Sequence, residues 1–361
     1  MSNRIHVSTR KGLFTLERSS SSSAWRVAGT QFLGHNVTLA LADGDTVWAC
    51  LALGHYGPKI RRSDDGGATF KDVGTPALPA VDEATLKPGE KAPATSTIWA
   101  LEKAASGKLW CGTIPGGVFT SMDRGDSWQL VQSLWDHPDR QEWRGGGADE
   151  PGVHSLLVDP RDDKCIVAGV SCGGVWRTED DGASWQLHGK GMFAVFMPPE
   201  RRDDPRIQDP HQLDACKSAP DVVYAQHHNG VFKSDDGGRT FRELKVPPSS
   251  FGFAVAVHPN DANRAWFIPA TSDETRIPID GKLVVARTKD GGASFDVVTK
   301  GLPTSPSWDI VYRHALDVDA SGDILAFGST TGGVWTSDDG GDSWSALEAR
   351  LPPIAAVRFA T

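Results

Sequence analysis

The sequence predicts an all-β protein, a seven-bladed β-propeller that forms one domain over residues 1–361. Three observations predict it: an octapeptide that recurs six times, short apolar runs between its copies, and two chain ends that each supply part of one further blade. Gly (39) and Pro (23) are frequent, and Trp (13) and Phe (14) far outnumber Tyr (3). Many turns and many aromatic packing residues favour a β-rich fold.

The octapeptide follows the pattern [Ser/Thr]-x-Asp-x-Gly-x-[Ser/Thr]-[Trp/Phe]. Its copies are SDDGGATF (63–70), SMDRGDSW (121–128), TEDDGASW (178–185), SDDGGRTF (234–241), TKDGGASF (288–295) and SDDGGDSW (337–344). Successive aspartates of the pattern are 58, 57, 56, 54 and 49 residues apart. A period near 50 residues with short β runs indicates a propeller or a related array.

The chemistry of the octapeptide is that of a hairpin turn. Gly supplies a positive φ, Asp and Ser/Thr hydrogen-bond to the turn backbone, and the aromatic residue packs between sheets. On these six copies the chain resembles the Asp-box, or BNR-repeat, propeller superfamily that includes the sialidases. It also resembles bacterial single-domain BNR-repeat proteins of the glycosyl-hydrolase-like kind, through GHYGPKIRRSDDGG, QHHNGVFKSDDGG and TTGGVWTSDDGGDSW.

Each copy has the same surroundings, so a blade is expected to run from inner strand A through strands B and C to the octapeptide and outer strand D. The predicted blades two to seven are 35–75, 96–133, 153–189, 210–246, 251–299 and 309–349. Blade one is predicted to combine 1–30, which reads as strands B, C and D, with 352–361, an A-like strand. The C-terminal strand then closes the ring and removes exposed sheet edges. Ser19 to Ser23 would replace the octapeptide in blade one, although a serine tract could instead be a linker or phosphosite.

Composition excludes several classes of partner. The formal charge of −9 gives no basic footprint for nucleic acid. The N-terminus lacks the apolar core of a secretory signal, and no stretch approaches the ~18 apolar residues of a membrane span. The five cysteines (Cys50, Cys111, Cys165, Cys172 and Cys216) form no zinc-type pairs. We therefore expect a cytoplasmic protein with buried thiols and no nucleotide cofactor, unless a leader was removed.

Strand alternation sorts the features onto two faces. The B–C turns and the D–A connections share the upper face, and the octapeptides lie on the lower face, where their carboxylates are structural. The long insertions 74–96, 134–152, 189–210 and 270–282 all fall on the upper face. Loop mass around one mouth of an axial channel marks the expected ligand side.

Seven of the eleven histidines map to this upper face. Aligned A strands place His154, His211 and His314 in one column, which Thr38, Thr97 and Phe253 hold in other blades. Three neutral imidazoles with an open position would suit a divalent transition metal such as Zn or Mn. Such a site resembles that of the oligogalacturonate lyases, whose repeats differ. The alternative is that a polar channel mouth uses histidine to hydrogen-bond loops and water.

Further candidates surround this column. Glu150 or His228 would act as general base or acid, and Arg313 or Arg144 would fix an anionic group. The residues expected to contact substrate are His35 and His55, Gln226 and His227 of a B–C turn, and Tyr312. Because neighbouring residues on a strand point to opposite sides, Arg313 and His314 can both face the channel only if the strand is irregular.

True sialidase activity is not expected. Sialidases use three arginines for the substrate carboxylate, and their Arg-Ile-Pro motif precedes the first repeat. Here Arg276-Ile277-Pro278 follows four copies, and no clear third arginine joins Arg313 and Arg144. The leading hypothesis is a metal-assisted hydrolase or lyase acting on a carbohydrate or other small polar or anionic substrate. The competing hypothesis is a non-catalytic propeller that binds a ligand or a protein partner.

Overall fold

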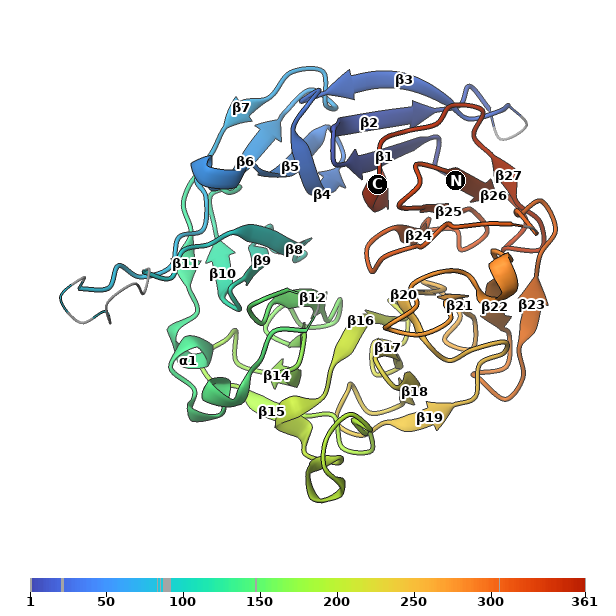
Figure 1. Cartoon of the computed structure of the whole chain (residues 1–361). Helices are drawn as coiled ribbons and strands as arrows, with labels where there is room; N and C mark the ends of the chain where they lie inside the picture. Colours follow the sequence, from blue (N-terminus) through green and yellow to red (C-terminus); the bar gives the residue numbers. More distant parts are fainter. Residues whose placement is uncertain are drawn as a thin grey trace.

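The computed structural model describes residues 2–20, 23–82, 84, 86, 92–146, 148–304 and 306–360. Over these residues the strands form seven four-stranded antiparallel sheets, arranged around an axis as the blades of a β-propeller (Figure 1). The prediction of an all-β, seven-bladed propeller is therefore confirmed. Ser21 and Ser22 of the serine tract lie outside the described residues.

The first three sheets, from the inner strand outwards, are as follows. Blade one is β28 (Ile354–Phe359), β1 (Arg4–Thr9), β2 (Gly12–Glu17) and β3 (Arg26–Gln31). Blade two is β4 (Asn36–Asp43), β5 (Thr46–Ala52), β6 (Pro58–Ser63) and β7 (Lys71–Asp72). Blade three is β8 (Thr97–Lys103), β9 (Leu109–Ile114), β10 (Val118–Ser121) and β11 (Gln129–Leu130).

The remaining sheets repeat this order. Blade four is β12 (Val153–Val158), β13 (Ile166–Val170), β14 (Gly174–Thr178) and β15 (Gln186–His188). Blade five is β16 (Pro210–Ala215), β17 (Val223–His227), β18 (Gly230–Ser234) and β19 (Arg242–Leu244). Blade six is β20 (Gly252–Val257), β21 (Ala265–Pro269), β22 (Val285–Thr288) and β23 (Asp296–Val298). Blade seven is β24 (Leu316–Val318), β25 (Leu325–Gly328), β26 (Val334–Ser337) and β27 (Ser345–Ala346).

In the residues that the structure describes, helical structure is confined to short turns in the connections. These are α1 (Gln132–Trp135) and the 3₁₀ turns η1 (Gly54–Tyr56), η3 (Pro138–Glu142), η4 (Pro199–Arg201), η5 (Pro205–Ile207) and η6 (Ile279–Gly281). In the described part of the chain, no helix has the length and apolar character that crossing a bilayer requires.

The two ends of the chain close the ring. β28 pairs antiparallel with β1 in a register that places Val357 opposite Val7, and both termini lie together beside blade one (Figure 1). This pairing confirms the prediction that the C-terminal strand joins the N-terminal blade. It buries the edges that two open blades would expose.

The octapeptide forms the same hydrogen-bonded turn in its six copies. In blade five, Ser234 Oγ donates to Asp236 Oδ1 (2.7 Å) and accepts from the Gly238 N–H (2.9 Å). Asp236 also accepts from Thr240 N and Thr240 Oγ1. Gly238 has a φ of 86°, where a side chain would be strained. The aspartate of the pattern is thus occupied by its own turn, as a structural role requires.

Each turn also attaches to the preceding blade. In blade seven, the Gly340 carbonyl accepts from Arg287 Nη1 (2.8 Å) and Trp266 Nε1 (3.1 Å) of blade six. Trp266 is fully buried, so the indole supplies both apolar area and a donor. The repeat therefore fixes neighbouring blades to one another as well as closing hairpins.

The inner strands carry a β-bulge near the upper mouth of the channel. Register shifts fall at Thr38, Trp99, His154 and His211 in blades two to five. Trp99 therefore occupies the column that sequence alignment gave to Thr97, because a bulge in blade three moves the register. Bulges turn side chains away from strict alternation, which sets the geometry of the channel mouth.

Candidate functional site

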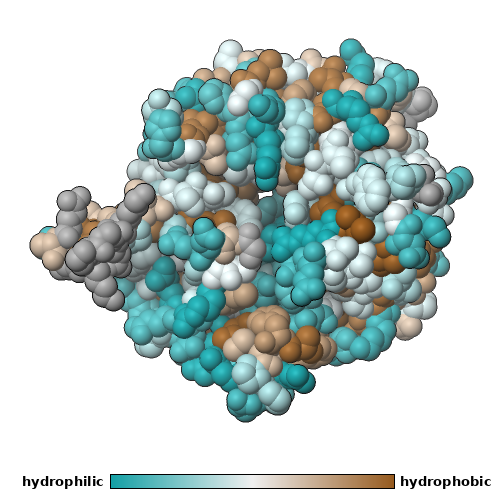
Figure 2. All heavy atoms as spheres, in the orientation of Figure 1, coloured by the Kyte–Doolittle hydropathy of each residue, from teal (hydrophilic) through white to brown (hydrophobic). Residues whose placement is uncertain are grey.

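A cavity of about 1150 Å³ lies at the upper mouth of the channel, on the side of the B–C turns and D–A connections. Residues of all seven blades line it, among them Arg144, Asp209, His211, His228, Tyr312 and Arg313. The molecular surface is hollowed at the centre of the ring, with hydrophilic side chains along part of the hollow (Figure 2). The predicted ligand face therefore contains a cavity lined by several of the predicted residues.

Asp209, His211 and His228 converge at this cavity. Asp209 ends the D–A connection before β16, His211 lies at the bulge of β16, and His228 follows β17. Asp209 Oδ2 lies 3.6 Å from His211 Nε2 and 3.4 Å from His228 Nδ1. Among the described residues these three form the one group of His, Cys, Asp or Glu whose ligand atoms lie within 4.8 Å of each other.

Backbone contacts hold the three side chains in place. Asp209 Oδ1 accepts from the Cys172 N–H (3.1 Å), and the His228 N–H donates to the Asp209 carbonyl (3.0 Å). His211 Nδ1 lies 2.7 Å from the Gly252 carbonyl, and its ring stacks on Phe253 at 4.8 Å. The arrangement is thus fixed before any ligand enters.

Burial and neighbouring charges shift the pKa values of His211 and Asp209. Burial lowers the pKa of His211, against the opposing effect of the Asp209 carboxylate. For Asp209 burial raises the pKa, but the two imidazoles and the Arg313 charge outweigh it and hold the pKa of the carboxyl well below its usual range. The group therefore combines a buried carboxylate with a neutral His211 near neutral pH.

Arg313 is a buried cation beside this group. It is 9% exposed, and its Nε is buried without a hydrogen-bond partner. Its guanidinium carbon lies 4.7 Å from the centre of the Trp99 ring and 5.9 Å from that of Phe253. Within the described residues it forms no ion pair at 4.0 Å or less. Burial lowers its pKa, which Asp209 partly offsets.

The cavity is cationic in a chain that carries a formal charge of −9. The ionised lining residues are five arginines and four carboxylates, Arg10, Arg144, Arg201, Arg276, Arg313, Glu142, Asp209, Asp273 and Glu274. Two arginines pair with two of the carboxylates, Arg201 with Glu142 and Arg276 with Asp273. Arg144 instead donates to the carbonyls of Gln141 and Trp143. Of the remaining residues, the three arginines Arg10, Arg144 and Arg313 outnumber the two carboxylates Asp209 and Glu274, so the lining carries one net positive charge.

The predicted metal ligands do not form one group. His314 Nε2 lies 2.8 Å from the His154 carbonyl across the channel, and His154 Nδ1 lies 2.8 Å from Ser155 Oγ. Both residues are buried, and burial lowers the pKa of each. Of the three, His211 alone belongs to the converging group, because His154 and His314 are used to join opposite blades. His314 precedes β24 in irregular backbone, which allows both it and Arg313 to line the cavity.

The other predicted contact residues have mixed positions. Tyr312 and Arg144 line the cavity, whereas Glu150, His35 and His55 are exposed and do not. Gln226 and His227 were expected in a turn, but both belong to β17 and are buried. Gln226 donates to the Ser250 carbonyl (2.9 Å). His227 Nε2 lies 3.0 Å from the backbone nitrogen of Asp209, and His227 Nδ1 lies 3.0 Å from that of Asn229. These two side chains do not line the cavity. They contact the backbone of the segments that carry Asp209 and His228 and of the segment before β20.

Sequence reasoning missed Asp209, Trp99 and Arg276 at the cavity. Asp209 could have been found, because residues two apart on an extended segment point to the same side and His211 was already a candidate. Arg276 was set aside because its Arg-Ile-Pro tripeptide follows four copies of the repeat, yet it lines the cavity with its guanidinium 5.5 Å from the Phe253 ring centre. Trp99 was hidden by the bulge in β8.

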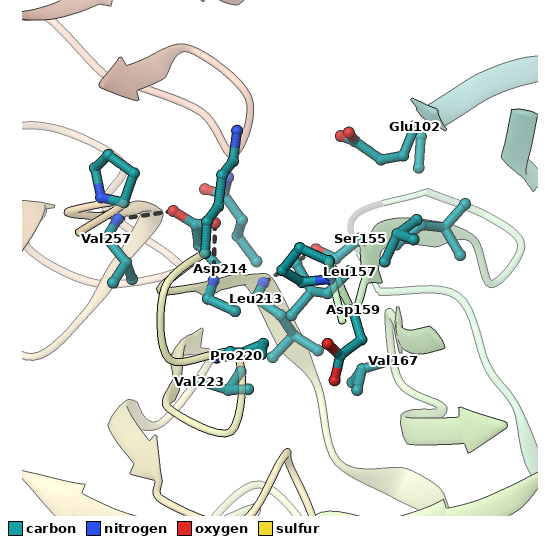
Figure 3. A pocket seen from close by; sticks show the side chains of 18 of the residues that line it. Glu102, Ser155, Leu157, Asp159, Val167, Leu213, Asp214, Pro220, Val223 and Val257 are labelled. Carbon is teal, nitrogen blue, oxygen red and sulfur yellow. Dashed lines mark hydrogen bonds between the residues drawn. The ribbon is translucent and has the colours of Figure 1, made fainter. Parts of the chain in front are cut away.

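A second cavity, of about 440 Å³, lies further along the channel (Figure 3). Two of its carboxylates, those of Asp214 and Asp317, accept hydrogen bonds from the backbone of the inner strands. Asp214 accepts from the Val257 N–H (2.7 Å) and the Ala215 N–H (2.9 Å), and Asp317 accepts from the Phe359 N–H (2.8 Å). Burial raises the pKa of Asp214 to about 7. These roles are structural, so the upper cavity is the candidate site.

No protein-family model matches the chain. The chain is similar to an oligoxyloglucan-reducing end-specific xyloglucanase of Emericella nidulans, with 23% identity over 329 residues that cover 82% of this chain and 37% of the xyloglucanase. In structure it is similar to an ancestral GH74 enzyme (TM-score 0.59, 17% identity, 86% of this chain and 38% of that chain). It is also similar to YCF48 bound to D1 peptide (TM-score 0.55, 13% identity, 90% and 92%).

The chain thus spans little more than a third of the xyloglucanase and of the GH74 enzyme. At these identities the structural likenesses show a shared propeller fold.

Proposed function

We propose that the chain is a carbohydrate-active hydrolase that binds its substrate in the upper cavity and holds an anionic group of that substrate at Arg313. The observation that carries this proposal is the buried Arg313 guanidinium without an ion-pair partner. Burying an uncompensated charge is costly, so such a group is favoured where a ligand of opposite charge completes it. The 23% identity to a xyloglucanase over 82% of the chain supports a carbohydrate as the substrate.

Aromatic rings support a sugar ligand as well. Trp99, Phe196, Phe253 and Tyr312 line the cavity around Arg313 and His228. Ligand sites combine apolar and aromatic walls with a few polar groups that set orientation. The cavity volume of about 1150 Å³ accommodates more than one sugar ring. Phe196 is 47% exposed, which leaves its ring available to a ligand.

The reactive centre in this proposal is the group Asp209, His211 and His228. It lies in the same cavity as Arg313, so an anion at Arg313 would position the rest of the substrate beside it. Arg144 supplies a second cation at the rim. Glu150, the other predicted acid or base, is exposed and does not line the cavity, so His228 takes that place in the proposal.

The test measures hydrolysis of neutral xyloglucan oligosaccharides and of uronate-bearing oligosaccharides by release of reducing ends. We expect the acidic substrates to be preferred. Arg313→Met should lower kcat/KM for them by roughly 10- to 100-fold, the equivalent of one charge-assisted contact. Arg26→Met, on the exposed outer strand β3, is the matched control. Equal loss in both variants, or no preference for acidic substrates, would contradict the role of Arg313.

A second function is favoured by one observation. Val195 is 50% exposed and Phe196 is 47% exposed, next to each other at the rim of the cavity. Exposed apolar side chains beside a cavity are typical of a docking surface. A propeller that only binds a saccharide or protein would show saturable binding by calorimetry without release of reducing ends. Hydrolysis that depends on His228 would exclude it.

A further inference from the structure

We propose that Asp209, His211 and His228 bind one divalent transition-metal ion, with Zn²⁺ preferred. The inference deepens the proposed function, because it assigns a cofactor to the reactive centre of the same cavity. The ligand set differs from the His154, His211 and His314 set expected from sequence. Its basis is the hydrogen-bonding state of His211 and the spacing of three ligand atoms.

The proton of His211 is located by its partner. A carbonyl oxygen can only accept, so the contact of 2.7 Å between His211 Nδ1 and the Gly252 carbonyl places the proton on Nδ1. In the neutral ring Nε2 then presents a lone pair. That lone pair lies 3.6 Å from Asp209 Oδ2, which is also an acceptor. Nε2 is therefore the ring atom of His211 that faces the carboxylate, and the two atoms can bind one metal ion together.

Two of the three separations match shared coordination, and all three ligand atoms lie within 4.8 Å of one another. Zinc binds imidazole nitrogen and carboxylate oxygen at about 2.0–2.2 Å in tetrahedral geometry, which puts neighbouring ligand atoms roughly 3.3–3.6 Å apart. The Asp209 oxygen lies 3.6 Å from the His211 nitrogen and 3.4 Å from the His228 nitrogen. Two nitrogens and one oxygen favour Zn²⁺, then Mn²⁺, over Mg²⁺ or Ca²⁺.

The outer contacts are those of an organised metal site. The Gly252 carbonyl orients His211, and the Cys172 N–H holds the second carboxylate oxygen of Asp209. Such contacts fix ligand tautomers and orientation. The His228 side chain is 21% exposed and faces the cavity edge-on to Phe196. Three protein ligands beside an open cavity leave a fourth position for water or substrate, the arrangement of a catalytic rather than a structural site.

The chemical consequence follows from that fourth position. A bound Zn²⁺ would lower the pKa of a coordinated water and supply a nucleophile near neutral pH. With a metal bound, His228 acts as a ligand in place of an acid or base, and Arg313 holds the substrate anion nearby. The metal also balances the buried Asp209 carboxylate.

Direct metal binding tests the proposal without any substrate. The untagged full chain is treated with chelator, dialysed, and titrated with ZnCl₂, MnCl₂ and MgCl₂ by calorimetry. We expect one equivalent of Zn²⁺ to bind, more tightly than Mn²⁺ and at least 100-fold more tightly than Mg²⁺. Co²⁺ absorption in the visible range then reports coordination by nitrogen.

Variants separate this site from adventitious binding. His228→Ala and Asp209→Asn should each weaken Zn²⁺ affinity at least 100-fold, while His55→Ala, an exposed histidine of the same face, should leave it unchanged. Unfolding in urea checks that each variant is folded. No stoichiometric Zn²⁺ binding, or binding unchanged in both site variants, would overturn the proposal. Hydrolysis by the chelated protein would overturn the catalytic role of the metal and leave the proposed hydrolase standing.

Discussion

Replacing Arg313 by Met should stabilise the ligand-free protein. Arg313 is 9% exposed, and its close contacts are the Trp99 ring at 4.7 Å and the Phe253 ring at 5.9 Å, with a weaker attraction to the Asp209 carboxylate beyond ion-pair distance. A cation–π contact contributes about 0.5–2 kcal/mol. The desolvation penalty of a buried ion is several kcal/mol, and no ion pair among the described residues offsets it. Met has a similar length without the charge, so the free energy of unfolding should rise by about 1–2 kcal/mol.

Urea unfolding at pH 7, followed by tryptophan fluorescence, measures this change. The matched control is Arg287→Met, because Arg287 is also buried but donates to the Gly340 carbonyl and to Asp342. Losing those two contacts should lower the free energy of unfolding by about 2–4 kcal/mol. The two identical substitutions should therefore shift the urea midpoint in opposite directions. Urea titrations resolve a change of about 1 kcal/mol in the free energy of unfolding. A fall of about that size or more for Arg313→Met would refute the view that this charge is kept for a ligand.

Three further outcomes are expected. Ser234→Ala removes a buried hydroxyl that both donates and accepts a hydrogen bond in its turn. It should lower the free energy of unfolding by about 1–2 kcal/mol. Ser19→Ala, at an exposed position, should leave the urea midpoint unchanged. Burial lowers the pKa of His6 to about 4, so the unfolded chain takes up a proton that the folded chain refuses between pH 6.5 and about 4. Stability should fall by up to about 3 kcal/mol as the pH falls through that window, and His6→Gln should flatten the urea-midpoint profile. Burial raises the pKa of the Cys50 and Cys111 thiols, so mass spectrometry after native alkylation should find both unmodified, and labelling there in the folded state would contradict their burial.

The sequence by itself determined the propeller, because its information is local and repeated. Each octapeptide contains the glycine, aspartate and hydroxyl that its own turn needs, as Ser234, Asp236 and Gly238 show. Six copies at a regular period leave one way to bury the apolar strands between them. The complementary chain ends then indicate the closing pair, β28 with β1.

The candidate site was predicted in part, for a physical reason. The upper face and His211, His228, Arg313, Arg144 and Tyr312 follow from strand order, since order fixes the face on which a turn lies. The partners of each side chain do not follow from it. His314 reaches the His154 carbonyl, 160 residues away across the channel, a contact that no local pattern encodes.

Only the tertiary structure decided which polar groups meet. The bulges of the inner strands moved Trp99 into the column assigned to Thr97 and turned His211 towards Asp209. Bulges and ring closure depend on packing between blades, and that packing depends on residues far apart in the chain. The repeat therefore specifies the scaffold locally, whereas the site is specified by contacts between segments that the ring brings together.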